Sequence, residues 1–289
     1  KADAFFAGRK VSFGDQQKRT LNIIGADGTY TNLGMLLSDQ CVHTIKLAVF
    51  EGSKKTVFRD RKELTGSLLT QLENAYSYID QFNRTRAEFE GLDRIDKRDY
   101  PAEALREALL NAITHRDYSF SGSTLISIFD DRIEFVTIGG LVRGLSFNDI
   151  MLGVSALRNQ KLANVFYRLH LIEAYGTGIL KINESYSDCD VKPQFEVTDN
   201  AFKITLPNIN YAGERKELPT APVRIGRKSD RKEIVLQLAE KQGSITRKEV
   251  EAELRISQAS AILLLREMVE SGLLIKEGTG NRCKYRVAE

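Results

Sequence analysis

Three polar residues recur at intervals of four in residues 106–118, which read REALLNAITHRDY. Glu107, Asn111 and His115 carry a carboxylate, an amide and an imidazole, groups that bind cations or move protons. Their spacing places them on one side of an α-helix, one turn apart. Asn is unusual in mid-helix because it prefers caps and turns. We interpret this side as a candidate functional surface; the ordinary alternative is a solvated helix face.

The other side of the same helix is apolar and would face a core. Pro101 stands near the first turn, where a missing N–H costs nothing. Glu103 extends the polar side by one turn. The apolar side follows helical spacing and consists of Leu105, Ala108, Leu109, Ala112 and Ile113. The sequence therefore predicts a helix over 102–116 that is buried on one face.

The segments around this helix predict an α+β fold. Residues 43–52, STLISIF (123–129) and RIEFVTI (132–138) have strand composition, and the last two are joined at Asp130-Asp131. QFEVTDNAFKITLP (194–207) predicts a hairpin that turns at Asp199-Asn200. Helical spacing is found over 63–82, in LANVFYRLHLIEAYG (162–176), which ends at Gly176, and around GILKINESY (178–186).

Composition excludes several classes of protein. Hydrophobic residues make up 42% of the 289 and charged residues 28%, as in globular proteins. No apolar run approaches the roughly 18 residues of a membrane span. Three distant cysteines argue against a disulfide framework or a zinc site and indicate a reducing cytoplasm. The chain starts at Lys1 and has no signal peptide, so we expect a fragment or a processed chain.

The C-terminal part has a sharp pattern of its own. Residues 231–243 and 246–254 predict helices, the second with a capping box between Thr246 and Glu249. A third helix follows Ser257 as N-cap, and residues 273–278 and 283–287 predict a hairpin. The net charge of the chain is +3, and residues 213–289 hold 16 Lys and Arg against 12 Asp and Glu. The basic excess therefore lies in this part.

This order of elements resembles the winged helix-turn-helix family. The resemblance implies binding of double-stranded DNA, with the third helix in the major groove and basic side chains on phosphates. Protein interaction or dimerisation is the alternative use of such a module. The residues that would contact DNA are Lys248, Ser257, Gln258, Ser260, Lys276, Arg282 and Lys284.

The spacing Glu107-x-x-x-Asn111 resembles the N-box helix of the GHKL (Bergerat-fold) ATPases, to which DNA gyrases and histidine kinases belong. The resemblance implies an α/β sandwich in which Asn111 binds Mg²⁺ that bridges ATP phosphates. It also implies that Glu107 activates water in members that hydrolyse ATP. His115-Arg116-Asp117 lacks the other motifs of a protein kinase, and Arg116 is expected near the C-terminal dipole of the helix.

EALLNAITHRDYS is still more similar to a bacterial family of transcriptional regulators. Its members join an AlbA-like, Schlafen-related domain to a divergent GHKL-like domain, often with a C-terminal winged helix. YTNLGMLL (30–37), RIEFVTIGGL (132–141) and residues 157–182, with their Arg-Asn and GTGI segments, resemble parts of that family. The AlbA-like domain would lie mostly before Lys1.

Two glycine pairs match the glycine boxes of the GHKL resemblance. Gly139 and Gly140 correspond to the first box, where the usual adenine-reading Asp is absent from residues 136–140. Gly176, Thr177 and Gly178 correspond to the second, where glycines let backbone N–H groups approach phosphate. Taken alone, such pairs are more often tight turns and helix caps.

These observations predict four regions: an α/β segment over 1–90, a GHKL-like domain over 91–210, a linker over 211–228 and a winged helix over 229–289. The leading hypothesis is a cytoplasmic DNA-binding regulator, a homodimer, whose nucleotide-type pocket senses a ligand. The second is a Mg²⁺-dependent ATPase with Glu107 as base. The third is a scaffold with a degenerate pocket. The operator and the effector do not follow from the sequence.

Overall fold

The computed structural model describes residues 2–173, 176–213, 228–254, 258–278 and 283–288. The chain divides into two compact units, Lys1–Val223 and Arg224–Glu289, and this division falls within the expected linker. Each unit has its own cluster of buried apolar side chains. No helix in the described ranges is long and apolar enough to cross a membrane.

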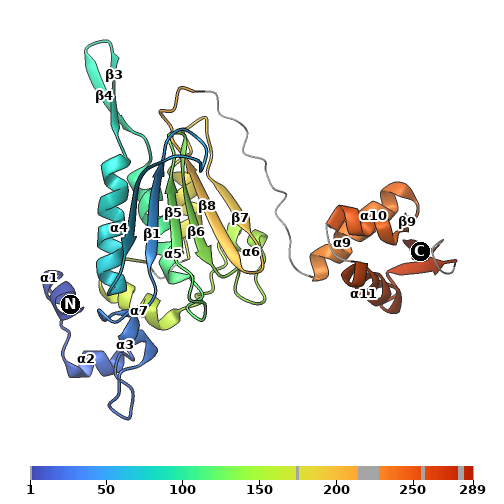
Figure 1. Ribbon diagram of the computed structural model, residues 1–289, viewed down its shortest axis with the longest axis horizontal. Coiled ribbons are helices and arrows are strands. Elements are labelled where there is room, and N and C mark those ends of the chain that lie inside the picture. The colour runs from blue at the N-terminus through green and yellow to red at the C-terminus, as the bar shows by residue number, and fades with distance from the viewer. Residues whose placement is uncertain (1, 174–175, 214–227, 255–257, 279–282, 289) are drawn as a thin grey trace. The chain divides into compact units, whose positions relative to one another are not determined.

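The first unit contains a six-stranded sheet, a two-stranded hairpin and helices (Figure 1). Its helices are α1 (Ala2–Gly8), α2 (Asp15–Thr20), α3 (Asn32–Leu36), α4 (Leu68–Phe82), α5 (Ala102–Thr114), α6 (Phe147–Met151), α7 (Gln160–Arg168) and α8 (Gly178–Glu184). Its strands are β1 (Ile45–Phe50), β2 (Phe58–Leu64), β3 (Thr85–Glu90), β4 (Asp93–Arg98), β5 (Thr124–Ile128), β6 (Arg132–Ile138), β7 (Gln194–Val197) and β8 (Ala201–Pro207).

The strand order of the large sheet is β2-β1-β5-β6-β8-β7. β1 and β5 are parallel, and the other neighbours are antiparallel. β1 and β2 thus share one sheet with the strands that follow α5. The boundary expected at residue 90 falls inside a single unit, because the parallel β1–β5 pairing crosses it.

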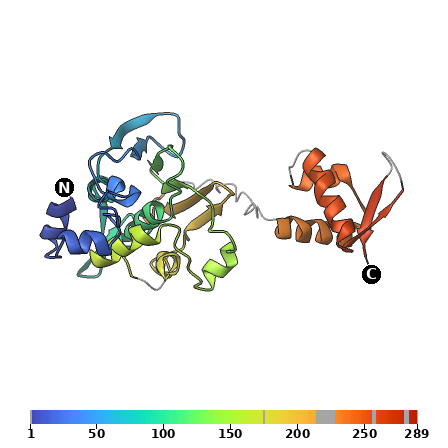
Figure 2. The ribbon, with the colours of Figure 1, turned by 90° about the horizontal axis from the view of Figure 1, so that it is seen from below.

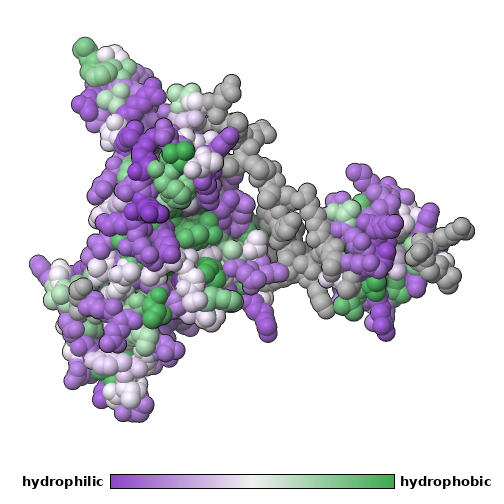
Figure 3. Space-filling model, in the orientation of Figure 1, coloured by the Kyte–Doolittle hydropathy of each residue, from purple (hydrophilic) through white to green (hydrophobic). Residues whose placement is uncertain are grey.

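Alternate side chains of this sheet face a layer of helices. On β6, Ile133, Phe135 and Thr137 are at most 3% exposed, and the Thr137 hydroxyl donates to the Ala112 carbonyl of α5 at 2.8 Å. Figures 1 and 2 show the helices gathered on one side of the sheet. On the side facing the viewer in Figure 3, apolar patches interrupt a hydrophilic surface. The unit is therefore an α+β sandwich with a mixed sheet.

The expected hairpin turns lie where the sequence placed them, but two helices differ. Residues 63–64 belong to strand β2, and α4 begins only at Leu68, because Gly66 turns the chain at φ +81°. The helix expected to run to Gly176 ends at Arg168, since His170 takes a left-handed φ of +55°. The Leu171 N–H then donates to the Phe166 carbonyl, which closes the helix end as in a Schellman motif.

The β3–β4 hairpin was not expected from the sequence. Its two strands pair only with each other, and the hairpin projects beyond the end of the large sheet (Figure 1). Phe89 is 74% exposed and Leu92 is fully exposed. Ile95 is the one apolar residue of β4, and the other five are charged, so this strand has no apolar periodicity.

The second unit consists of α9 (Lys228–Gln242), β9 (Ile245–Thr246), α10 (Arg247–Leu254), α11 (Gln258–Glu270), β10 (Leu274–Glu277) and β11 (Lys284–Val287). Its sheet has the order β10-β11-β9. The expected capping box is confirmed: the Thr246 N–H donates to Glu249 Oε2 at 2.7 Å, and the Glu249 N–H donates to Thr246 Oγ1 at 3.4 Å. The short strand β9 was not expected. The N-cap expected at Ser257 lies outside the described residues.

Candidate functional site

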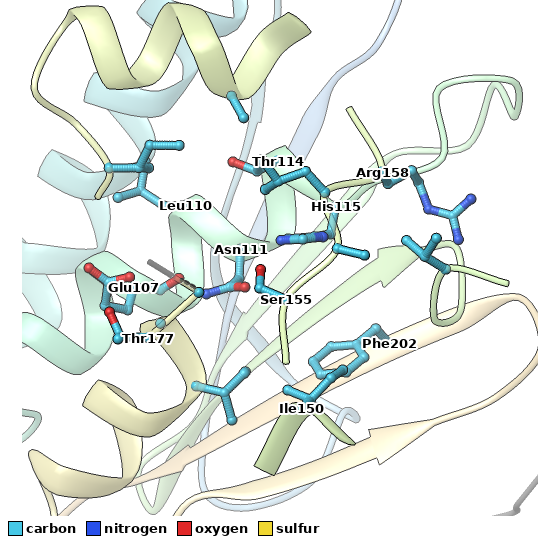
Figure 4. A pocket seen from close by; sticks show the side chains of 18 of the residues that line it. Glu107, Leu110, Asn111, Thr114, His115, Ile150, Ser155, Arg158, Thr177 and Phe202 are labelled. Carbon is cyan, nitrogen blue, oxygen red and sulfur yellow. Dashed lines mark hydrogen bonds between the residues drawn. The ribbon is translucent and has the colours of Figure 1, made fainter. Parts of the chain in front are cut away.

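A cavity of about 470 Å³ lies in the first unit beside α5. Its wall is formed by α5, the loop after β6, residues 150–158, part of α7 and the start of α8 (Figure 4). All seven residues expected to form a nucleotide site line it: Glu107, Asn111, Gly139, Gly140, Gly176, Thr177 and Gly178. Folding thus brings together residues that lie up to 71 positions apart in the sequence.

Helix α5 holds Glu107 and Asn111 one turn apart on the cavity wall. Ala104, Leu105, Ala108 and Leu109 bury the opposite side to 1% exposure or less, which fixes the rotation of the helix. Glu107 is itself only 9% exposed, so the polar side is a cavity wall and not a solvated face.

Burial governs the protonation of Glu107. It raises the pKa of the carboxyl above its usual value, and the nearby charges of Arg106 and Lys181 oppose this in part. Glu107 Oε1 is paired with the Arg106 guanidinium, which also donates to the Leu171 carbonyl at 2.5 Å. The carboxylate is thus held by its neighbour beside the cavity.

Asn111 uses its amide nitrogen locally. Asn111 Nδ2 donates to the Glu107 carbonyl at 2.9 Å. No donor among the described residues is paired with its side-chain oxygen. Figure 4 shows Asn111 between Glu107 and His115 on the wall. An amide oxygen in this position can bind a hard cation or accept a hydrogen bond.

Gly178 lies directly against these two side chains. A Cβ at this position would stand 2.8 Å from Asn111 Nδ2 and 3.1 Å from Glu107 Oε2. Gly176 has φ +68°, and a Cβ there would overlap Ser155. The glycines of the 176–178 segment are therefore required by close approach to the cavity wall.

Gly139 and Gly140 are explained by backbone packing. Gly139 has φ +110° and its N–H donates to the Asn200 carbonyl at 2.8 Å. A Cβ on Gly140 would overlap the Thr198 and Asp199 carbonyls. This pair lines the cavity, and its residue type follows from the tight contact with the β7–β8 turn.

His115 and Asp117 both lie near the Arg158 guanidinium. His115 lines the cavity, and burial together with the Arg158 guanidinium lowers its pKa to about 4. Asp117 Oδ2 accepts from Arg158 Nη1 at 3.2 Å, and Arg158 Nη2 donates to the Gly140 carbonyl at 3.0 Å. Because its pKa is lowered, His115 is a neutral imidazole at pH 7.

Arg116 does not lie at the helix dipole as expected. It is 2% exposed and donates to the Phe120 and Gly122 carbonyls and to Thr124 Oγ1. The loop between α5 and β5 folds around the guanidinium because a buried cation needs acceptors for its N–H groups.

Sequence reasoning missed several cavity residues. Arg158, Glu173, Lys181 and Phe202 were not expected there. The Arg-Asn segment at 158–159 was a usable signal: Asn159 Nδ2 donates to the Thr114 and Arg116 carbonyls at 2.8 and 2.7 Å and so closes the end of α5. Lys181 Nζ pairs with Glu173 Oε2 at 2.7 Å, which no local pattern indicated.

The cavity wall has a polar part and an apolar part. Glu107, Asn111 and Lys181 supply polar groups, while further wall residues are apolar: Leu110, Leu145, Ile150, Val154, Ile172 and Phe202. This suits an amphipathic ligand with a flat apolar part and a charged part. The described residues hold no cluster of three or more His, Cys, Asp or Glu able to bind a metal alone. A cation here would need oxygens from the ligand as well.

The second unit exposes most of the residues expected to contact DNA. Lys248 on α10, Gln258 at the start of α11, Lys276 and Lys284 are exposed, and Ser260 is partly buried. Ser257 and Arg282 lie outside the described residues. Lys276 pairs with Tyr285 and Lys284 with Glu277, so the two lysines point to opposite faces of the hairpin.

Helix α11 also exposes apolar side chains. Ile262 is 45% exposed and Leu263 is 67% exposed. The expected helix order and hairpin are present, and the assignment of this unit as a winged helix stays a prediction.

Comparison with known proteins supports an ATPase-like domain. Residues 122–206 match a family model described as "Putative ATP-dependent DNA helicase recG C-terminal". These residues are part of a divergent ATPase-like domain. The match covers less than half of the chain and begins after α5, so it includes Gly139–Gly140 and Gly176–Gly178 but neither Glu107 nor Asn111. No curated protein matches the chain.

A solved structure has a similar fold. It is the crystal structure of the DIP2311 protein from Corynebacterium diphtheriae, which matches with a TM-score of 0.61 and 21% sequence identity. The match covers 99% of this chain, whereas the chain spans 60% of the length of that protein. At this identity the likeness concerns the fold alone.

Proposed function

We propose that the chain binds a nucleotide together with Mg²⁺ in the α5 cavity and acts as a ligand-responsive regulator. The observation that carries the proposal is the meeting of Glu107, Asn111 and Gly178 in that cavity. The carboxylate and the amide stand one helical turn apart, and the facing backbone has no side chain to fill the space. The ATPase-like family match supports the same reading.

Asn111 is the proposed ligand of the nucleotide-bound cation. Its amide oxygen has no donor among the described residues. Mg²⁺ in such sites is held by one or two protein oxygens, with the remaining positions filled by phosphate and water. The apolar wall around Leu145, Ile150 and Phe202 would receive the base.

Nucleotide binding is tested by thermal unfolding of the chain with ATP, ADP and other nucleotides, with and without Mg²⁺. We expect a Mg²⁺-dependent rise in Tm that Asn111→Ala abolishes; a ligand at 100 times its Kd adds about 2.7 kcal/mol. Asn183→Ala on α8 is the matched control, because Asn183 does not line the cavity. A flat response to every nucleotide would favour the scaffold alternative.

ATP hydrolysis is the second candidate, and the burial of Glu107 favours it. A raised carboxyl pKa brings a general base closer to its working pH. The absence of an acid at residues 136–140 counts against adenine specificity. We expect any Mg²⁺-dependent hydrolysis to be lost in Glu107→Gln while nucleotide binding is kept. Undiminished hydrolysis in this variant would remove Glu107 from the mechanism.

We further propose that residues 228–289 form a winged helix that binds double-stranded DNA, with two copies of the chain reading one site. The order of helices and hairpin and the exposed Gln258 at the start of α11 support this. Lys284→Glu should weaken binding to all sequences, and Gln258→Ala should change sequence preference in a mobility-shift assay. Unchanged affinity in Lys284→Glu and in Lys276→Glu would favour protein interaction through Ile262 and Leu263.

A further inference from the structure

A second cavity, of about 420 Å³, lies at the other end of the large sheet. The register places it there: Ile128, Phe129 and Asp130 at the end of β5 line it. The α5 cavity instead lies beyond the end of β6, near the start of β5, because Val136 pairs with Leu125. The two cavities share no lining residue.

Three arginines line this second cavity. Arg59 comes from β2, Arg84 follows α4, and Arg86 is in β3. Arg59 Nη1 lies 3.5 Å from Asp130 Oδ1, and Arg86 Nε lies 3.6 Å from Glu88 Oε1. No acceptor among the described residues is paired with the Arg84 guanidinium. Arg84 is thus a solvent-exposed cation at the wall without an acidic partner among the described residues.

The two acids of the wall are already engaged. Asp99 Oδ1 accepts from Asn210 Nδ2 at 3.0 Å. Asp130 Oδ2 accepts from the Gly52 N–H at 2.8 Å and its other oxygen faces Arg59. The lining residues therefore carry one excess positive charge, and Arg84 is the arginine that faces no acid, since Arg59 faces Asp130 and Arg86 faces Glu88.

Tyr100 closes the cavity on its inner side. It lines the cavity and is 1% exposed, and its hydroxyl is buried without a partner among the described residues. The groups near this hydroxyl include Tyr186, Asp131 and Arg132, which do not line the cavity. The hydroxyl therefore lies on the interior side of the wall, and the arginines are the groups open to a ligand.

The main chain fixes Tyr100 and Arg84 beside each other. Asn83 Nδ2 donates to the Tyr100 carbonyl at 3.0 Å, and the Tyr100 N–H donates to Asn83 Oδ1 at 2.9 Å. The Asp99 N–H donates to the Arg84 carbonyl at 2.8 Å. These bonds fix the main chain at Arg84 and Tyr100, so the Arg84 side chain starts from a defined position beside the cavity.

We propose that this second cavity binds the phosphate group of a small phosphorylated molecule. Arg84 supplies the charge, since a guanidinium offers paired donors to phosphate oxygens. The apolar side chains of Phe82, Phe129 and Ile128 in the same wall receive the remainder of the ligand. The volume suits a compact ligand, whereas a nucleic acid strand would run along the surface beyond it.

The test is calorimetric titration of the full chain with phenyl phosphate, a probe that carries one phosphate and one ring. We expect saturable binding that Arg84→Gln weakens at least tenfold. Arg61→Gln is the matched control, because Arg61 is exposed on β2 and does not line the cavity. Asn111→Ala should leave this binding unchanged, which separates the second cavity from the proposed nucleotide site.

Three outcomes would overturn the proposal: no saturable binding of phenyl phosphate, binding that Arg84→Gln leaves intact, or binding that only Asn111→Ala removes. Titration with a twelve-residue oligothymidylate distinguishes the source of the phosphate. Saturable binding of the oligonucleotide with steep salt dependence, without binding of phenyl phosphate, would assign the arginines to nucleic acid instead.

Discussion

At the scale of single residues, Gly178 packs directly against the polar wall of the α5 cavity. Gly178→Ala would push a methyl group against Asn111 Nδ2 at 2.8 Å and Glu107 Oε2 at 3.1 Å. We expect a loss of about 1–3 kcal/mol in unfolding free energy from this overpacking, together with loss of any nucleotide-induced rise in Tm. Gly8→Ala is the control, since nothing lies within 4 Å of its Cβ position. Equal effects of the two substitutions in chemical denaturation would contradict this view of the wall.

His115 predicts a pH dependence of stability. Its folded pKa of about 4 lies below the ordinary 6.5 because the neutral imidazole is buried near Arg158. The unfolded chain therefore binds a proton that the folded chain does not between pH 6.5 and 4. The contribution of His115 to the unfolding free energy should be fully present above pH 6.5. It should fall by roughly 3 kcal/mol as the pH drops to 4.

The measurement is urea denaturation of the wild type and His115→Gln at several pH values. The difference between the two curves isolates His115 from the other groups that titrate in this range. A difference that does not change with pH would show that His115 binds its proton equally in the folded and the unfolded chain.

At the scale of elements, the loop between α5 and β5 depends on Arg116. Its buried guanidinium donates to the Phe120 and Gly122 carbonyls and to Thr124 Oγ1. Arg116→Met would remove these charged hydrogen bonds and should cost about 3 kcal/mol of unfolding free energy. It should also disturb the cavity wall at His115, the preceding residue.

Arg94→Met on the exposed β3–β4 hairpin is the matched control for this substitution. Arg94 pairs with Asp96 at 2.8 Å, and both side chains are more than half exposed. Such pairs contribute less than about 1 kcal/mol. If guanidinium denaturation gives similar losses for both variants, the buried network does not stabilise the loop.

Helix α5 and the sheet show how much a local pattern can determine. The apolar spacing of Leu105, Ala108 and Leu109 predicted which side of α5 is buried, and the structure confirms it. The β5–β6 and β7–β8 turns were likewise confirmed at Asp130-Asp131 and Asp199-Asn200. The end of α7 at Arg168 was not predicted, because a left-handed His170 has no strong sequence signal.

At the scale of the whole chain, two apolar cores predict independent unfolding. Val235, Ile245, Val250, Leu265 and Met268 are fully buried within the second unit. We expect the intact chain to unfold in two transitions. Residues 1–213 and residues 228–289, produced separately, should each unfold cooperatively, at the midpoint temperature of one of these transitions. Circular dichroism during heating measures this. A C-terminal piece without a cooperative transition would show that its core is insufficient alone.

The sequence by itself determined the elements whose signals are local. Helical spacing, turn residues and the Thr246–Glu249 capping box depend on neighbours a few positions away, and the α+β class followed from their order. The residues expected to form one nucleotide site, from Glu107 to Gly178, were also named from sequence, by resemblance to a motif.

Only the tertiary structure decided what surrounds those residues. Arg158 and Lys181 reach the α5 cavity, and β1 pairs in parallel with β5, through contacts between distant segments. Arg59, Arg84 and Arg86 became a candidate site only when folding placed them at one cavity. Charge balance, burial and missing partners are properties of side chains in space, so no local pattern in the chain could supply them.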